Sequence, residues 1–167
     1  CSATDISQWS SSASGTTTCA PAIAPYTATF NGPAWTRGAN IFSLGTINSC
    51  WRRDEDFYVF KSGPPIFVST QTGATFDHTT GTSSGKYLYA ERLNFTTQSD
   101  TAIISSVPID LTALTIPEMT FWYHMYGVDI DKLTVLVSDN GGQSFTQVAQ
   151  LTGQKQNSNT DAWKEMV

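Results

Sequence analysis

Two short stretches of the chain alternate in side-chain character with a period of two residues, which is the period of a β-strand. In residues 86–91, Tyr87 and Tyr89 fall on one face, and Leu88 and Ala90 fall on the other. Residues 119–125 carry large side chains on both faces, which is typical of an inner strand of a β-sandwich. We therefore predict that both stretches are strands of one all-β domain, with both faces of residues 119–125 largely covered.

Further strands are predicted where β-branched and aromatic residues form short runs between turn residues. They lie at residues 26–30, 56–60, 66–68, 102–106, 133–138 and 145–151, and a last strand begins at Trp163. The run Asp139-Asn140-Gly141-Gly142 predicts a hairpin turn, because Asn-Gly readily adopts positive φ angles. No stretch has a sustained helical period. The pattern predicts an antiparallel β-sandwich of the jelly-roll type.

The predicted domain spans residues 26–167. Residues 1–25 are rich in Ser, Thr and Ala, have little apolar surface to bury, and are interpreted as a leader or linker. Because a strand begins at Trp163, only four residues before Val167, we expect the C-terminal end of the domain to be truncated.

Composition excludes some classes of partner. The 167 residues are 40% hydrophobic and 14% charged, so the chain has enough apolar residues to form a hydrophobic core and is not expected to be disordered. Its net charge of −5 argues against nucleic acid and against an anionic membrane surface, since both require a basic face. No apolar run approaches the length of a membrane span, so we expect no membrane insertion.

The three cysteines, Cys1, Cys19 and Cys50, allow at most one internal disulfide. We expect the pair Cys1–Cys19, and Cys19–Cys50, which would tie the leader to the domain, stays open as the alternative. The chain has no C-x-x-C motif, so a zinc knuckle is not indicated.

The run Asp77-His78-Thr79-Thr80-Gly81-Thr82, followed by Gly85 and residues 87–91, resembles the core motif of MAM domains. Residues 121–127, Phe-Trp-Tyr-His-Met-Tyr-Gly, resemble the second signature of that family almost residue for residue. The resemblance covers about residues 26–167. The family usually has a cysteine just before the second signature, but residues 117–119 are Pro-Glu-Met here, so its usual second disulfide is absent.

MAM domains are jelly-roll β-sandwiches of extracellular proteins and are not catalytic. The resemblance implies an extracellular adhesion or interaction module in a larger secreted or cell-surface protein, and not an enzyme. Its partners would be a protein or glycan on a cell or matrix surface and the neighbouring domains of its own polypeptide. The Ser/Thr-rich leader and few cysteines look more like bacterial members than animal receptors.

The alternative function is a carbohydrate-binding module that targets an attached enzyme. Both kinds of module are jelly rolls, so fold alone does not separate them. A row of exposed aromatic side chains would favour sugar binding, whereas an exposed apolar patch would favour contact with protein.

The resemblance also implies a structural cation, calcium or sodium, because some MAM domains hold one near this loop and the first strand. Asp77 and Asn31 would be its ligands, since hard cations take carboxylate and amide oxygens. The competing interpretation is that Asp77 caps a turn by accepting hydrogen bonds from backbone N–H groups.

The remaining candidates have structural interpretations that we favour. His124 is interpreted as a hydrogen-bonded core residue. The match of residues 81–85 to G-x-S-x-G lacks the following helix of a nucleophile elbow. The carboxylates Asp54, Glu55 and Asp56, and likewise Asp129 and Asp131, are interpreted as solvated loop residues. Of the five tryptophans, Trp9 and Trp35 are the ones we expect to be exposed, and hence the candidates for stacking on a sugar.

Overall fold

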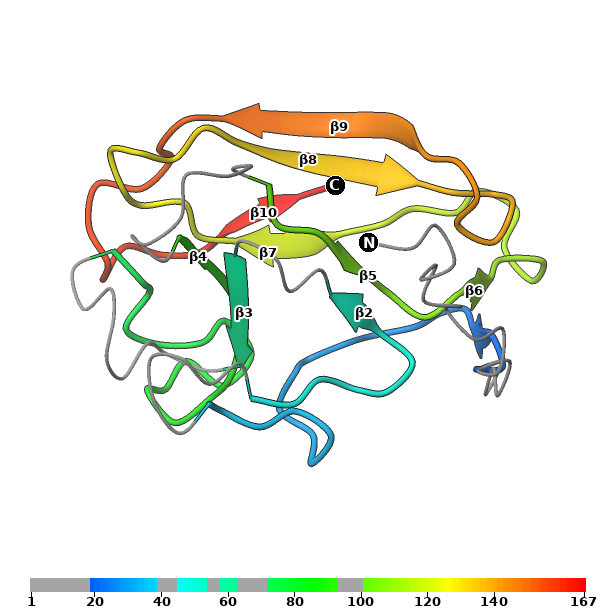
Figure 1. Cartoon of the computed structure of the whole chain (residues 1–167), viewed down its shortest axis with the longest axis horizontal. Coiled ribbons are helices and arrows are strands. Elements are labelled where there is room, and N and C mark those ends of the chain that lie inside the picture. The colour runs from blue at the N-terminus through cyan, green and yellow to red at the C-terminus, as the bar shows by residue number, and fades with distance from the viewer. Residues whose placement is uncertain (1–18, 39–44, 54–57, 63–71, 93–100) are drawn as a thin grey trace, which may run out of the picture.

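The computed structural model describes residues 19–38, 45–53, 58–62, 72–92 and 101–167, and this part of the chain contains strands and no helix (Figure 1). The predicted all-β fold class is confirmed. The strands are β1 Ala22–Ile23, β2 Arg52–Arg53, β3 Tyr58–Ser62, β4 Leu88–Arg92, β5 Ile104–Ser105, β6 Ile109–Asp110, β7 Phe121–Tyr123, β8 Lys132–Val137, β9 Thr146–Thr152 and β10 Lys164–Met166.

The described strands pair two by two. The pairs β2–β5, β3–β4, β7–β10 and β8–β9 are antiparallel, as predicted, and the two-residue pair β1–β6 is parallel. Strands β7 to β10 run along the long axis of the molecule, and β3 crosses them at a steep angle (Figure 1). This arrangement agrees with the layers of a β-sandwich.

The hairpin β8–β9 is the longest paired element, and its turn confirms the prediction at Asn140-Gly141. Gly141 and Gly142 have φ angles of 73° and 86°, which side chains with a Cβ rarely adopt. The Asn140 Oδ1 atom accepts hydrogen bonds from the backbone N–H groups of Gln143 at 3.1 Å and Ser144 at 3.0 Å. The turn is therefore fixed by backbone conformation and by one asparagine side chain.

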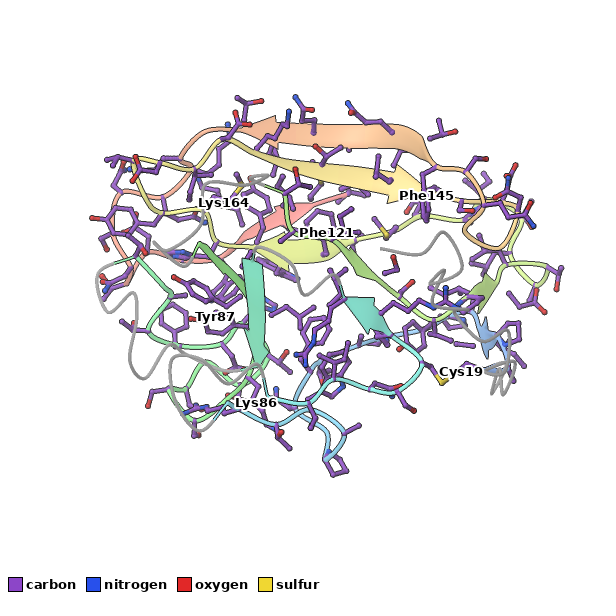
Figure 2. The ribbon with its side chains drawn as sticks, in the orientation of Figure 1. Cys19, Lys86, Tyr87, Phe121, Phe145 and Lys164 are labelled. Carbon is purple, nitrogen blue, oxygen red and sulfur yellow. A yellow bond between two sulfur atoms is a disulfide. The ribbon has the colours of Figure 1, made fainter. Side chains whose placement is uncertain are left out.

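The strand predicted at residues 86–91 is present as β4, which begins at Leu88, and Tyr87 directly before it is the buried residue of the predicted Tyr87–Tyr89 face. Tyr87 is 6% exposed, donates its hydroxyl to the Ala74 carbonyl at 2.7 Å, and packs edge-on against Trp163 at 5.2 Å between ring centroids. Figure 2 places Tyr87 towards the interior and Lys86 among the loops at the lower edge of the molecule. The chain thus enters β4 with the side chain of Tyr87 directed inward, while Lys86 stays among the loops.

The prediction that both faces of residues 119–125 are covered is wrong in part. Met125 is 6% exposed, but Met119 and Trp122 are 53% and 41% exposed. Met119 lies before the three-residue strand β7. Trp122 lies within β7, and the ring of His78 covers one face of its indole while the rest stays exposed. Burial therefore does not follow the bounds of the strand, since Trp122 within β7 is exposed and Met125 beyond its end is buried.

Two further expectations are wrong. Residues 26–30 are not a strand, because Phe30 has a φ of 61°, which breaks an extended conformation. Trp35, expected to be exposed, is 6% exposed and packs edge-on against Phe30 at 5.0 Å and Trp51 at 5.4 Å. The turn after Phe30 folds this segment back, which brings the three rings together.

Three expectations lie outside the described residues. These are the exposure of Trp9, the strand at residues 66–68, and the carboxylates of Asp54, Glu55 and Asp56.

Cys19 and Cys50 form a disulfide with a Cα–Cα distance of 5.6 Å, so the expected pair Cys1–Cys19 is wrong and the alternative is correct. Cys1 lies outside the described residues. The segment after Cys19 is also held by backbone hydrogen bonds, since Ala22 donates to Pro108 at 2.8 Å and Ala24 donates to Asp110 at 3.0 Å. These contacts place Cys19 near the end of the molecule that holds β6 (Figure 2).

Replacing Cys19 by serine is expected to lower the free energy of unfolding by about 3 kcal/mol, because the disulfide closes a loop with a sequence separation of 31. Denaturant unfolding measures the loss. Cys50→Ser should give a similar loss, and Cys1→Ser should leave stability unchanged. A loss with Cys1→Ser equal to that with Cys19→Ser would contradict the observed pairing.

Candidate functional site

The loop that begins at Asp77 is organised around the carboxylate of that residue. Asp77 is 0% exposed. Its Oδ1 atom accepts hydrogen bonds from the Thr80 hydroxyl and from the Thr82 backbone N–H at 3.3 Å. Its Oδ2 atom accepts from the Thr80 backbone N–H at 3.0 Å and from the Asn31 amide at 3.2 Å. The interpretation of Asp77 as a turn cap is therefore correct.

Asn31 and Lys86 join this loop to the segment that follows Phe30. The Asn31 Oδ1 atom accepts a hydrogen bond from the Lys86 backbone N–H at 2.8 Å, while its amide nitrogen faces Asp77. The Lys86 ammonium donates to the carbonyl oxygens of Gly32, at 3.2 Å, and of Trp35. We call Asn31, Gly32, Trp35, Asp77 and Lys86 the Asp77 cluster.

Gly85 closes the cluster on the side of the carboxylate. A Cβ atom built on Gly85 would lie 2.0 Å from the Asp77 carboxyl carbon. No side chain fits at that distance, so only glycine lets the loop backbone cover Asp77.

The pKa of Asp77 reflects two opposed effects. Burial by itself raises the pKa, but hydrogen bonds from Thr80, Asn31 and Thr82 outweigh burial and hold the pKa of Asp77 below its ordinary value of 3.8. Asp77 is therefore ionised at neutral pH, and the charge is stabilised by neutral donors.

Asp77 and Asn31, the residues expected to bind a cation, are not arranged to bind one between them. A carboxylate offers about four acceptor positions, and four donors already bind the oxygens of Asp77. Asn31 turns its N–H₂ group towards Asp77, and its oxygen towards the N–H of Lys86. Elsewhere in the described ranges, no three His, Cys, Asp or Glu side chains gather closely enough to hold a metal ion.

His78, the residue after Asp77, stacks on Trp122 of β7. The two rings are 3.7 Å apart between centroids and 13° from parallel. His78 is exposed, and Trp122 remains 41% exposed although His78 covers one face of its ring. Glu165 of β10 lies opposite Trp122 in the register of the two strands. Sequence reasoning missed Trp122, because its neighbours predict a buried strand.

His124 lies half-buried beside Trp163, with 5.6 Å between ring centroids. Its Nε2 atom is buried and has no hydrogen-bond partner among the described residues, so the expected hydrogen-bonded core histidine is only partly correct. Burial lowers the pKa of His124 below its ordinary value of 6.5, and the charge of Asp161 opposes the shift. His124 is therefore neutral at pH 7.

Gln156 is a second buried polar residue that sequence reasoning missed. It is 1% exposed, accepts a hydrogen bond from the Met125 backbone N–H at 2.7 Å, and donates to the carbonyls of Tyr123 at 3.2 Å and Ala162 at 3.3 Å. One amide thus joins the end of β7 to the chain that leads into β10. The residue lies in a polar stretch, and nothing in that pattern singles it out.

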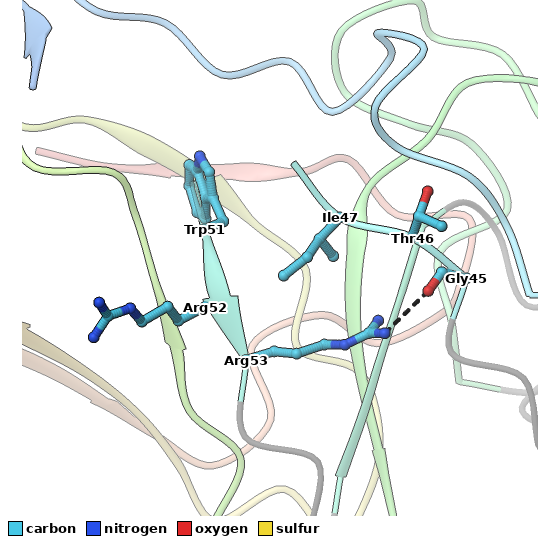
Figure 3. Close-up of a pocket in the computed structure, with 6 residues that line it drawn as sticks. All are labelled: Gly45, Thr46, Ile47, Trp51, Arg52 and Arg53. Atoms are coloured by element: carbon cyan, nitrogen blue, oxygen red, sulfur yellow. Dashed lines mark hydrogen bonds between the residues drawn. The ribbon is translucent and has the colours of Figure 1, made fainter. Parts of the chain in front are cut away.

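A surface depression of about 550 Å³ is lined by Gly45, Thr46, Ile47, Trp51, Arg52 and Arg53 (Figure 3). The two arginines point in opposite directions from β2, and Arg53 donates to the Gly45 carbonyl at 3.0 Å. They do not converge on one point, so the depression is not built as an anion site.

The other candidates take no part in a site. Asp129 and Asp131 are exposed, and Asp131 lies 3.8 Å from the exposed ammonium of Lys132, as expected of solvated loop residues. Residues 81–85 form turns within the Asp77 loop, and no helix follows them in the described part of the chain. The G-x-S-x-G match is therefore not a nucleophile elbow.

No described helix has the length and apolar character needed to cross a membrane.

The family model described as MAM domain, meprin/A5/mu, matches residues 46–167. The match contains Asp77, His78, Lys86 and the strand of Trp122, whereas Asn31 and Trp35 precede it. No solved structure matches the chain.

The stability of the domain is expected to fall as the pH falls through and below 6.5. Because the folded state lowers the pKa of His124, the unfolded chain binds a proton more readily, and protonation favours unfolding. Asp77 and Asp161 also have lowered pKa values, and their contributions are lost only below 3.8. Melting temperatures across this pH range measure the effect.

His124→Gln is expected to flatten the pH dependence near pH 6, and the matched variant His78→Gln to retain it. An unchanged slope in His124→Gln would assign the effect to another group.

Proposed function

The chain belongs to the MAM domain family, and on that premise we propose that it is an adhesion or interaction module of a larger secreted or cell-surface protein. MAM domains in general are extracellular, non-catalytic modules that mediate interactions within multidomain proteins. The proposed partner is a protein or glycan on a cell or matrix surface. The observation that carries the proposal is the family match over residues 46–167.

Exposed apolar side chains on the β8–β9 hairpin support a contact role. Leu136, Val137, Phe145 and Val148 are between 45% and 58% exposed. These side chains leave apolar area of the hairpin open to solvent, which a partner molecule could cover.

The proposal predicts that beads coated with the chain bind cells or extracellular matrix more than beads coated with an unrelated acidic protein of similar size. Protease treatment of the cells should abolish binding if the partner is a protein, and periodate oxidation should abolish it if the partner is a glycan. Binding no greater than that of the control beads, on every cell type and matrix tried, would contradict the function.

Glycan binding is the second candidate, because the Trp122–His78 pair favours it. One face of the indole is covered by His78, so its exposed area lies on the edges and the other face. Such a face can stack on the C–H groups of a sugar ring, and the carboxylate of Glu165 on the adjacent strand can accept hydrogen bonds from sugar hydroxyls. A sugar site requires an exposed aromatic ring with a polar group beside it, and Trp122 and Glu165 supply these two parts.

On a glycan array, this candidate predicts that the chain binds one class of polysaccharide and that Trp122→Ala weakens the binding about tenfold or more. Tyr26→Ala is the matched control, because Tyr26 is an aromatic residue of similar exposure, 37% against 41%, that lies outside the paired strands. No bound glycan, or equal binding by Trp122→Ala and the wild type, would exclude a sugar site at Trp122.

A further inference from the structure

We propose that the ammonium group of Lys86 replaces a bound cation in the Asp77 cluster, so that the domain requires neither calcium nor sodium to fold. The carbonyl oxygens of Gly32 and Trp35 are ligands that a hard cation takes, but here the ammonium of Lys86 binds both of them, while neutral donors bind the carboxylate of Asp77.

The first observation is the convergence of two backbone carbonyls on the Lys86 Nζ atom. Gly32 and Trp35 belong to one tight turn, closed by a hydrogen bond from the Trp35 N–H to the Gly32 carbonyl at 3.1 Å. Their carbonyl oxygens both accept from Lys86. Carbonyl dipoles that point at one position repel each other unless a positive charge lies between them, and the ammonium provides it.

The second observation is that the orientation of the Asn31 amide is fixed from both sides. Its oxygen accepts from the Lys86 N–H at 2.8 Å, and its nitrogen donates to Asp77 at 3.2 Å. Rotating the amide would place its oxygen against a carboxylate and its N–H₂ group against an N–H, so both contacts would become repulsive. Asn31 therefore cannot offer its oxygen to a metal without breaking the cluster.

The third observation is that Asp77 has no side open to a cation. Its four acceptor positions are taken, its exposure is 0%, and the Gly85 backbone lies against the carboxyl group. A metal ion would have to displace at least one of these hydrogen bonds.

The test compares the melting temperature of the full 167-residue chain with and without a chelator, and in buffers in which sodium is replaced by tetramethylammonium. We expect no shift in either comparison, and no stoichiometric calcium or sodium by elemental analysis of the dialysed protein. A fall in the melting temperature on either treatment, or one metal ion per chain, would overturn the proposal.

Lys86→Met tests the ammonium directly, because it retains an unbranched apolar stem and removes the charge. It is expected to lower the melting temperature by roughly 5 °C, whereas Lys132→Met, which removes an exposed ammonium paired with exposed Asp131, should change it by no more than about 1 °C. Equal melting of Lys86→Met and the wild type would refute the role of Lys86.

If Lys86→Met does not fold, the variant Lys86→Arg tests whether a positive charge at this position is enough to replace the cation. It keeps a positive charge and N–H donors, so it should fold and melt without any dependence on calcium or sodium. Failure to fold, or recovery only on addition of a metal, would count against the proposal.

Discussion

A carboxylate that has no access to water must receive hydrogen bonds from the protein, and Asp77 imposes this constraint on the domain. Three of its hydrogen bonds come from Thr80 and Thr82, which fixes the loop into a turn. The fourth comes from Asn31, 46 positions earlier, which fixes where the loop lies. The ionised group thus sets both the shape of the loop and its place, and strand β4 leaves the loop with Tyr87 already directed inward.

Local rules predict much of the fold from the sequence. The two-residue period gives β4, and Asn-Gly gives the β8–β9 turn, because each depends on neighbours in the chain. The same rules fail at residues 26–30. Their composition is that of a strand, but Phe30 has a left-handed conformation, and its ring packs against the distant rings of Trp35 and Trp51. In residues 26–30, tertiary contacts therefore override the β-strand propensity of the sequence.

In the candidate sites, too, the sequence predicts what depends on neighbouring residues and fails where distant contacts decide. The sequence singles out Asp77 and allows a turn cap, yet it does not show that Asn31 faces Asp77 with nitrogen, because this depends on the Lys86 N–H on its other side. For Trp35 and Trp122 the sequence predicts the opposite of the observed exposure, because the exposure of a tryptophan depends on which distant rings pack against it. Gln156 has no local signal, and its role comes from three backbone groups brought to it by the fold.

The position of Asn31 bears on where an autonomous folding unit can begin. The family match starts at Thr46, but a fragment starting there would lose the amide that binds Asp77, the two carbonyls that bind Lys86, and the cysteine that binds Cys50. It would keep a buried carboxylate with one donor missing and a lysine without its acceptors. The shortest stable version of this domain is therefore expected to extend upstream at least to Cys19, well before Thr46, where the family match starts.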